Sequence, residues 1–257
     1  LILASHRLGR KAASGQIDPG LVGYRYMRVF LVNNLYPPYV RGGAESVVVS
    51  SARVLRNAGH EVHVITLGRG SDVHWLWRTR TIREDGITVH RFAPMQFFNY
   101  TRNISQMPKW LRVFWHAWDL VDDMGYWVVR RRILQLRPDQ VYTHNVKGMG
   151  MRILRAARFA PQQTHVLHDV QLLTPSGLLW HGQETHWSIT GTWARLYRMI
   201  TRWYTKNFRV VEAPTQWIID SHRFFGLFAT AHCTKTVTSL PVASVQPRQA
   251  SPKKFLY

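Results

Sequence analysis

Two adjacent glycines, Gly42 and Gly43, stand between the apolar run 27–32 and an amphipathic segment, in the order strand, loop and helix. Glycines in such a loop let the backbone approach a ligand closely, and the first turn of the next helix offers free N–H groups and a positive dipole end. This chemistry suits a phosphate. The spacing is neither Gly-x-Gly-x-x-Gly nor a Walker loop, so dinucleotide and ATP sites are disfavoured, and a plain strand-to-helix turn is the competing interpretation.

Polar side chains also end two later apolar runs. His144 and Asn145 follow Tyr142-Thr143, and His168 and Asp169 follow Val166-Leu167. Ligands of open α/β sheets gather at the carboxyl ends of strands, so both pairs are candidates for a site. For His144 the alternative is a histidine satisfied by the backbone. Asp169 could orient His168, and it could equally cap a turn.

The order of several motifs resembles the opening of family 4 glycosyltransferases, the large retaining group with the GT-B fold. The resemblance runs from about Met27 to about Ala243. It is carried by Asn-Asn-x-Tyr-Pro-Pro-x-x-x-Gly-Gly-Ala-Glu at 33–45 and by the segments 55–66, 137–145, 166–175 and 213–228. Five segments in the same order are far more specific than any one of them.

The resemblance implies an α/β fold with a Rossmann-like parallel sheet and helices on both faces, the N-terminal half of a GT-B fold. We expect an N-terminal extension over 1–26, the acceptor-side domain over 27–243, and a linker or basic tail over 244–257. The family's C-terminal nucleotide-sugar domain, with its Glu-x7-Glu motif, is expected to be absent from this chain.

The implied reaction transfers a sugar, with retention, from a nucleotide-diphosphate sugar to a glycan or lipid-linked acceptor, in polysaccharide biosynthesis. The nucleotide sugar is a co-substrate, and neither a cofactor nor a metal is expected, since the chain has no Asp-x-Asp. The protein must neutralise the departing diphosphate and stabilise an oxocarbenium-like sugar. A separate C-terminal domain or subunit would be a partner.

The resemblance also assigns site residues. It implies catalytic roles for His144, beside the donor sugar, and for Asp169. It implies substrate or phosphate binding for the remaining candidates, which are Gly42, Gly43, Glu45, Asn145 and His168. Glu45 is ambiguous, because an acidic residue in a first helical turn also complements the helix dipole.

The charge calls for an anionic partner. The chain of 257 residues carries a formal net charge of +20, which suits a phosphate-bearing ligand, acidic lipid headgroups or nucleic acid. Nucleic acid is disfavoured because no finger, basic-zipper or RNA-recognition signature accompanies the charge. The single cysteine, Cys233, excludes an internal disulfide framework. No apolar run approaches the roughly 18 residues of a membrane span, so we expect a cytoplasmic chain, soluble or peripheral on the plasma membrane.

Short β-branched runs alternate with helical ones, which indicates a parallel sheet. The first helix is expected at about Ala44 to Ala58, ended by Gly59. The strands are expected at Arg28–Val32, Glu61–Thr66, Thr88–Phe92, Gln140–Thr143, His165–His168, Arg209–Glu212 and Thr236–Ser239.

Two later helices carry aromatic stripes. The first stripe is Trp110, Phe114, Trp118 and Val121; the second is Trp193, Leu196, Tyr197, Ile200 and Tyr204, beside a basic row of Arg195, Arg198, Arg202, Lys206 and Arg209. Such stripes suit a membrane surface, but packing into the core with a solvated basic face is the favoured interpretation. Asp122-Asp123 is interpreted as a solvated face in the middle of the first of these helices.

Two functions therefore compete. One is a catalytic half of a glycosyltransferase, from a truncated or split gene. The other is a non-catalytic module that keeps an anionic-lipid or phosphate-binding surface, which the expected loss of the second domain and the charge of +20 favour.

Overall fold

The computed structural model describes residues 26–69, 79–94, 107–177 and 190–236. The expected extension up to residue 25 and the expected tail over 244–257 lie outside the described residues.

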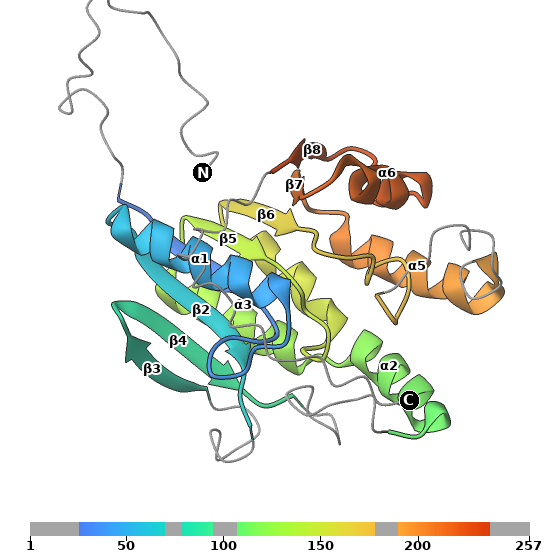
Figure 1. The fold of residues 1–257 in the computed structure, drawn as a ribbon, viewed down its shortest axis with the longest axis horizontal. Coiled ribbons are helices and arrows are strands. Elements are labelled where there is room, and N and C mark those ends of the chain that lie inside the picture. The colour runs from blue at the N-terminus through green and yellow to red at the C-terminus, as the bar shows by residue number, and fades with distance from the viewer. Residues whose placement is uncertain (1–25, 70–78, 95–106, 178–189, 237–257) are drawn as a thin grey trace, which may run out of the picture.

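The described residues form one sheet of eight strands in the order β3-β4-β2-β1-β5-β6-β7-β8 (Figure 1). Neighbouring strands are parallel, except for the antiparallel pair β3 and β4. The expected Rossmann-like α/β fold is confirmed. The strands are β1 (Arg28–Val32), β2 (Glu61–Leu67), β3 (Arg80–Glu84), β4 (Ile87–Phe92), β5 (Gln140–Thr143), β6 (Gln162–Val166), β7 (Val210–Ala213) and β8 (His232–Lys235).

Side-chain alternation along β1 divides the core into two layers. Val29 and Leu31 pack on one face of the sheet with Val48 of α1, whereas Phe30 and Val32 pack on the other face. The second layer is covered by the remaining helices, so helices lie on both faces (Figure 1). The helices are α1 (Gly43–Asn57), α2 (Lys109–Val121), α3 (Met124–Leu136), the 3₁₀ helix η3 (Met151–Phe159), α5 (Thr192–Thr205) and α6 (Gln216–Phe224).

Helix α1 shows how the first βαβ unit closes. Val48 and Ala52 are fully buried against the sheet. Gly59 has φ of +86°, the left-handed conformation that ends a helix at low cost for glycine, and β2 starts two residues later. The expected helix is confirmed, and both of its ends lie one residue earlier in the sequence than expected.

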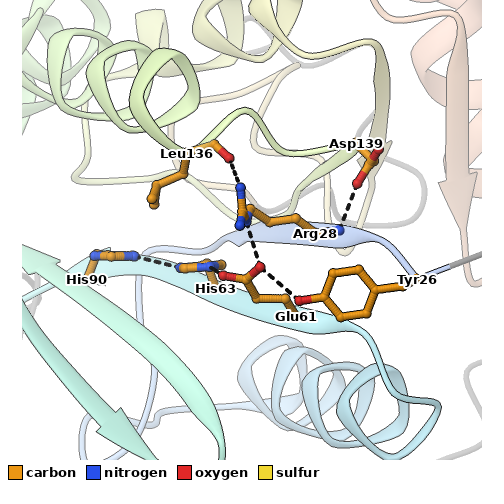
Figure 2. A network of polar contacts seen from close by, with 7 residues as sticks. All are labelled: Tyr26, Arg28, Glu61, His63, His90, Leu136 and Asp139. Carbon is orange, nitrogen blue, oxygen red and sulfur yellow. Dashed lines mark hydrogen bonds and ion pairs between the residues drawn. The ribbon is translucent and has the colours of Figure 1, made fainter.

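A polar network ties β1, β2 and β4 together at one side of the sheet (Figure 2). The Glu61 carboxylate accepts hydrogen bonds from Arg28 Nε at 2.7 Å and from the Tyr26 hydroxyl at 3.0 Å. Its other oxygen lies 2.9 Å from His63 Nε2, and His63 Nδ1 lies 3.0 Å from His90 Nε2. Glu61 and Arg28 are the first residues of their strands, so the network lies toward the amino-terminal edge of the sheet.

Several expected element boundaries are wrong. Strand β6 ends at Val166, so His168 and Asp169 lie in the loop after it. The last described strand is His232–Lys235 rather than 236–239, of which only Thr236 is described. The β3–β4 hairpin, turned by Asp85 and Gly86 with positive φ, was not expected.

The interpretation of Asp122 and Asp123 as a solvated helix face is also wrong. These residues separate α2 from α3, and Asp122 is buried, with its carboxylate accepting the Met124 N–H at 2.9 Å. Asp123 pairs with Arg152. The expected single helix is therefore two helices with a capped break.

The favoured core interpretation is wrong for the first aromatic stripe. Trp110 and Phe114 are 65% and 67% exposed, and Trp118 and Val121 are exposed as well. The second stripe is divided, since Tyr197 and Tyr204 are buried while Trp193 and Leu196 are exposed.

The basic row of α5 departs from expectation at one position. Arg198 is buried, with its guanidinium 4.5 Å from the centre of the Phe225 ring.

None of the helices in the described part of the chain is both long and apolar enough to cross a bilayer.

Candidate functional site

The site forms where the strand order reverses. The chain builds β2, β4 and β3 on one side of β1 and then returns to place β5 on the other side. The carboxyl ends of β1 and β5 flank this switch point, where open α/β sheets bind ligands. Asn33 and His144 directly follow these two strands.

Two buried asparagines fix the loops on either side of the switch point. Asn33 Oδ1 accepts the Asn145 N–H at 3.1 Å, and the Asn34 N–H donates to the Asn145 carbonyl at 2.7 Å. Asn34 Nδ2 donates to the Lys147 carbonyl at 3.0 Å. The loop after β5 is therefore held by side chains from the loop after β1.

His144 and His168 form a pair across the ends of β5 and β6. His144 Nδ1 lies 3.0 Å from His168 Nε2, and the two rings stack with centroids 5.3 Å apart. Burial, together with the neighbouring His168 and His165, holds the pKa of His144 well below its usual 6.5. Burial also lowers the pKa of His168 to about 4. Both imidazoles are therefore neutral at neutral pH.

Asn145 and Asp169 form a second pair beside the first. Asn145 Nδ2 donates to Asp169 Oδ2 at 3.4 Å, and Asp169 Oδ1 accepts the Gln171 N–H at 2.7 Å. Burial raises the pKa of Asp169, while the Gln171 hydrogen bond and the charge of Lys147 oppose that rise. Asp169 therefore caps a turn, as one of its interpretations predicted, and its role toward His168 or a substrate stays a prediction.

The glycine loop enters α1 without backbone strain. Gly42 is extended, with φ of −156°, and its N–H donates to Glu45 Oε2 at 2.7 Å. Glu45 is buried and serves as the cap of its own helix. A β-carbon built on Gly43 would meet no atom within 4 Å. The fold itself therefore does not require glycine at 43, and the space in front of the helix is open.

Lys147 lies near both Asp169 and Arg41, which precedes the glycine loop. Its ammonium donates to the Ser176 carbonyl at 3.2 Å, and it interacts electrostatically with Asp169 and with Arg41. Burial lowers the pKa of Lys147, and the carboxylates of Asp169 and Asp119 oppose this. Lys147 was missed in the sequence, although a basic residue two positions after Asn145 in a strand-end loop was an available signal.

Asp119 holds the loop after β5 from the other side. Its carboxylate accepts the Gly148 N–H at 3.0 and 2.9 Å and the Gly150 N–H at 3.0 Å. Asp119 lies on the inner face of α2, and no motif in the sequence pointed to it.

The arrangement suits recognition of a hydroxylated, anionic ligand. A neutral imidazole has one N–H and one lone pair, and the His144–His168 contact uses one nitrogen of each ring. His144 Nε2 is buried and has no hydrogen-bond partner within the described part of the chain. A buried polar atom without a partner is costly, so a hydrogen bond to this nitrogen would be stabilising, although the nitrogen is closed to solvent and a ligand reaches it only if neighbouring groups move. The described residues contain no group of three or more metal-ligating side chains.

Two solved structures align with most of the chain at low identity. A glycosyltransferase from Rickettsia africae is 11% identical with a TM-score of 0.40, and the match covers 82% of this chain and 43% of that one. The α,α-trehalose 6-phosphate synthase from Burkholderia multivorans is 13% identical with a TM-score of 0.46, and the match covers 78% of this chain and 42% of that one.

A curated relative, an uncharacterized 42.6 kDa protein in the cps region of Klebsiella pneumoniae, is 24% identical over 204 residues. The match covers 79% of this chain and 52% of the relative, so the chain spans about half the length of the proteins that it matches. The family model described as "Glycosyl transferase 4-like domain" matches residues 42–234. This range is more than half of the chain and includes every proposed site residue. The chain belongs to the glycosyl transferase 4-like family.

Proposed function

We propose that this chain supplies the acceptor-side half of a retaining glycosyltransferase. The enzyme transfers a sugar from a nucleotide-diphosphate sugar to a glycan or lipid-linked acceptor. The observation that carries the proposal is the pairing of His144 with His168 and of Asn145 with Asp169 at the strand ends, in a chain of this family.

The residues have distinct roles in the proposed reaction. The bond between the anomeric carbon and the diphosphate oxygen breaks, a bond to the acceptor oxygen forms, and the acceptor proton passes to the departing diphosphate. His144 Nε2 hydrogen-bonds a hydroxyl of the donor sugar, and Asp169 accepts a hydrogen bond from an acceptor hydroxyl. Lys147 and the N-terminus of α1 at Gly42 and Gly43 offset the charge of the diphosphate.

The nucleotide-selecting contacts are assigned to a C-terminal domain or subunit, because the chain spans about half the length of its relatives. The proposal sets the reaction in polysaccharide biosynthesis, on the cytoplasmic side of the plasma membrane. The description of the Klebsiella relative as a protein in the cps region supports the assignment to polysaccharide biosynthesis.

The test is sugar transfer from a panel of radiolabelled nucleotide sugars, by the chain alone and with a C-terminal half supplied. His144→Ala should lower kcat/KM at least about a hundredfold. His232→Ala, on the exposed β8 strand, is the matched control and should leave transfer unchanged. Failure to transfer any sugar in either arrangement would remove the catalytic claim.

A non-catalytic phosphate-binding module is the second candidate. Lys147 and Arg41 lie close enough to interact electrostatically beside the glycine loop, and the net charge is +20. Calorimetric binding of inorganic pyrophosphate without transfer of any sugar would favour this function.

A further inference from the structure

The outer face of α2 is an unusual surface for a folded chain. Five of its thirteen residues fall on one helical face and are apolar and exposed: Trp110, Val113, Phe114, Trp118 and Val121. We call these five residues the α2 stripe. The Trp110 and Phe114 rings meet edge to face with centroids 6.3 Å apart. A contiguous exposed apolar face of this kind marks an interaction surface.

The opposite face of α2 is anchored, so the stripe is presented by a fixed helix. Trp115, Asp119 and Leu120 are buried on that face. The Leu120 carbonyl accepts the Tyr204 hydroxyl of α5 at 3.0 Å, and the Asp119 carboxylate holds two backbone N–H groups of the loop after β5. Exposure of the stripe is therefore not a consequence of a loosely attached helix.

The exposed charges of the described chain are mostly basic. Within residues 107–177 and 190–219, no acidic residue is exposed, and Asp123 at the end of α2 is paired with Arg152. The same ranges expose the basic residues Arg131, Arg137, Arg158, Arg195, Arg202, Lys206 and Arg209. The exposed carboxylates of the described chain are Glu84 and Asp85, in the β3–β4 hairpin at the far end of the sheet from α2, and Asp220 of α6 (Figure 1).

We propose that the α2 stripe docks on an anionic phospholipid bilayer. Tryptophan and phenylalanine rings insert at the boundary between headgroups and acyl chains, while exposed arginines meet lipid phosphates. The chemistry favours an anionic bilayer because the stripe offers aromatic anchors on a chain whose described surface is mostly basic. This inference concerns α2 alone and does not rest on sugar transfer.

Vesicle co-sedimentation of the 257-residue chain tests the surface. The wild type should bind phosphatidylcholine vesicles that contain one third phosphatidylglycerol, should bind pure phosphatidylcholine far less, and should be released by added salt. Trp110→Ser with Phe114→Ser should lower the partition coefficient about tenfold or more, because two aromatic rings leave the interface.

A matched control removes the same two side-chain types elsewhere. Trp217 and Phe224 of α6 are 47% and 83% exposed, so Trp217→Ser with Phe224→Ser makes an equal change away from α2. This control should bind vesicles as the wild type does. Equal binding by the α2 variant and the wild type would overturn the proposal, because attraction would then come from net charge alone.

A second variant keeps the apolar surface intact. Trp110→Phe should bind as tightly as the wild type, but it should lose part of the tryptophan quenching caused by brominated lipids in the vesicles. Unchanged quenching would place Trp110 outside the bilayer and overturn the proposal. Negligible binding to both vesicle types, with a concentration-dependent dimer that the α2 double variant abolishes, would instead make the stripe an interface between copies of the chain.

Discussion

His144 Nδ1 lies 3.0 Å from His168 Nε2, and the two rings come from the ends of neighbouring strands. Each ring uses one nitrogen in this contact, which fixes the orientation of both. The remaining nitrogen of His144 is thereby held in one direction before any ligand binds, which lowers the entropy cost of recognising a hydroxyl there.

Gly43→Ala should separate binding from stability. The position is open and does not have positive φ, so alanine should leave the free energy of unfolding unchanged or raise it by up to about 1 kcal/mol. A methyl group in that open space should nonetheless abolish binding of a diphosphate to the loop. Calorimetric titration with pyrophosphate and thermal melts measure the two effects.

Gly59→Ala is the matched control for that substitution. Gly59 also has open space around it, but its φ is +86°, so alanine should cost about 1 kcal/mol of stability and leave anion binding intact. If Gly43→Ala binds pyrophosphate as the wild type does, the loop is only a turn.

Asp119→Asn should impair the site without touching a ligand. In asparagine an NH2 donor would face the Gly148 N–H in place of the acceptor Oδ2, and the negative charge would be lost, so we expect a loss of about 2–3 kcal/mol of stability. Hydrogen exchange of residues 145–150 should quicken, and pyrophosphate affinity should fall. Asp220→Asn, on exposed α6, is the control, and unchanged exchange in Asp119→Asn would contradict the assigned role.

Acid should destabilise the fold through buried histidines. Burial lowers the pKa values of His90 and His165 to about 3 and of His222 to about 4. Below a pH of about 6.5 the unfolded chain binds protons that the folded chain does not. The free energy of unfolding therefore decreases as the pH is lowered, by up to about 1.4 kcal/mol per pH unit for each histidine. Urea titrations from pH 7.5 to 5 measure this slope.

His90→Gln should make that slope shallower by the share of one histidine. An identical slope in His90→Gln and the wild type would show that His90 does not take part.

Glu61→Gln should weaken the amino-terminal edge of the sheet. Burial raises the pKa of Glu61, but hydrogen bonds from His63, Arg28 and Tyr26 outweigh it and bring the pKa to about 2. Because the folded pKa is depressed, the stabilisation is present above about pH 4.5 and is lost as pH falls toward 2. At pH 7 we expect a cost of about 1–2 kcal/mol, measured by urea unfolding.

Glu84→Gln is the control, since Glu84 is exposed on β3 and should change stability by less than about 0.5 kcal/mol. The difference between the two variants should shrink at pH 3. A constant difference across this range would contradict the assigned ionisation.

The sequence predicted the fold where local signals agree. The strand–glycine loop–helix unit from Arg28 to Gly59 has apolar alternation, a helical stripe and a glycine C-cap, and the structure confirms it. The expected pairs at 144–145 and 168–169 do meet, because carboxyl ends of parallel strands share one edge. The catalytic and binding roles of these residues stay predictions.

Other features depend on contacts between distant residues. Asp119 reaches Gly148 across 29 positions, which no local pattern encodes. Helical spacing in the α2 stripe could show which residues share a face, but not whether that face points inward or outward. The Asp122–Asp123 break was missed because a helix cap and a charged helix surface use the same residue types.

Helix α2 carries the stripe on one side and, through Asp119, the loop of Lys147 on the other. A contact that restrains the outer side therefore restrains the loop as well. Thermodynamic linkage makes such coupling reciprocal, so a ligand that orders the loop would strengthen attachment at the outer side by the same factor. Occupancy of the strand-end site and residence on a surface would then rise and fall together.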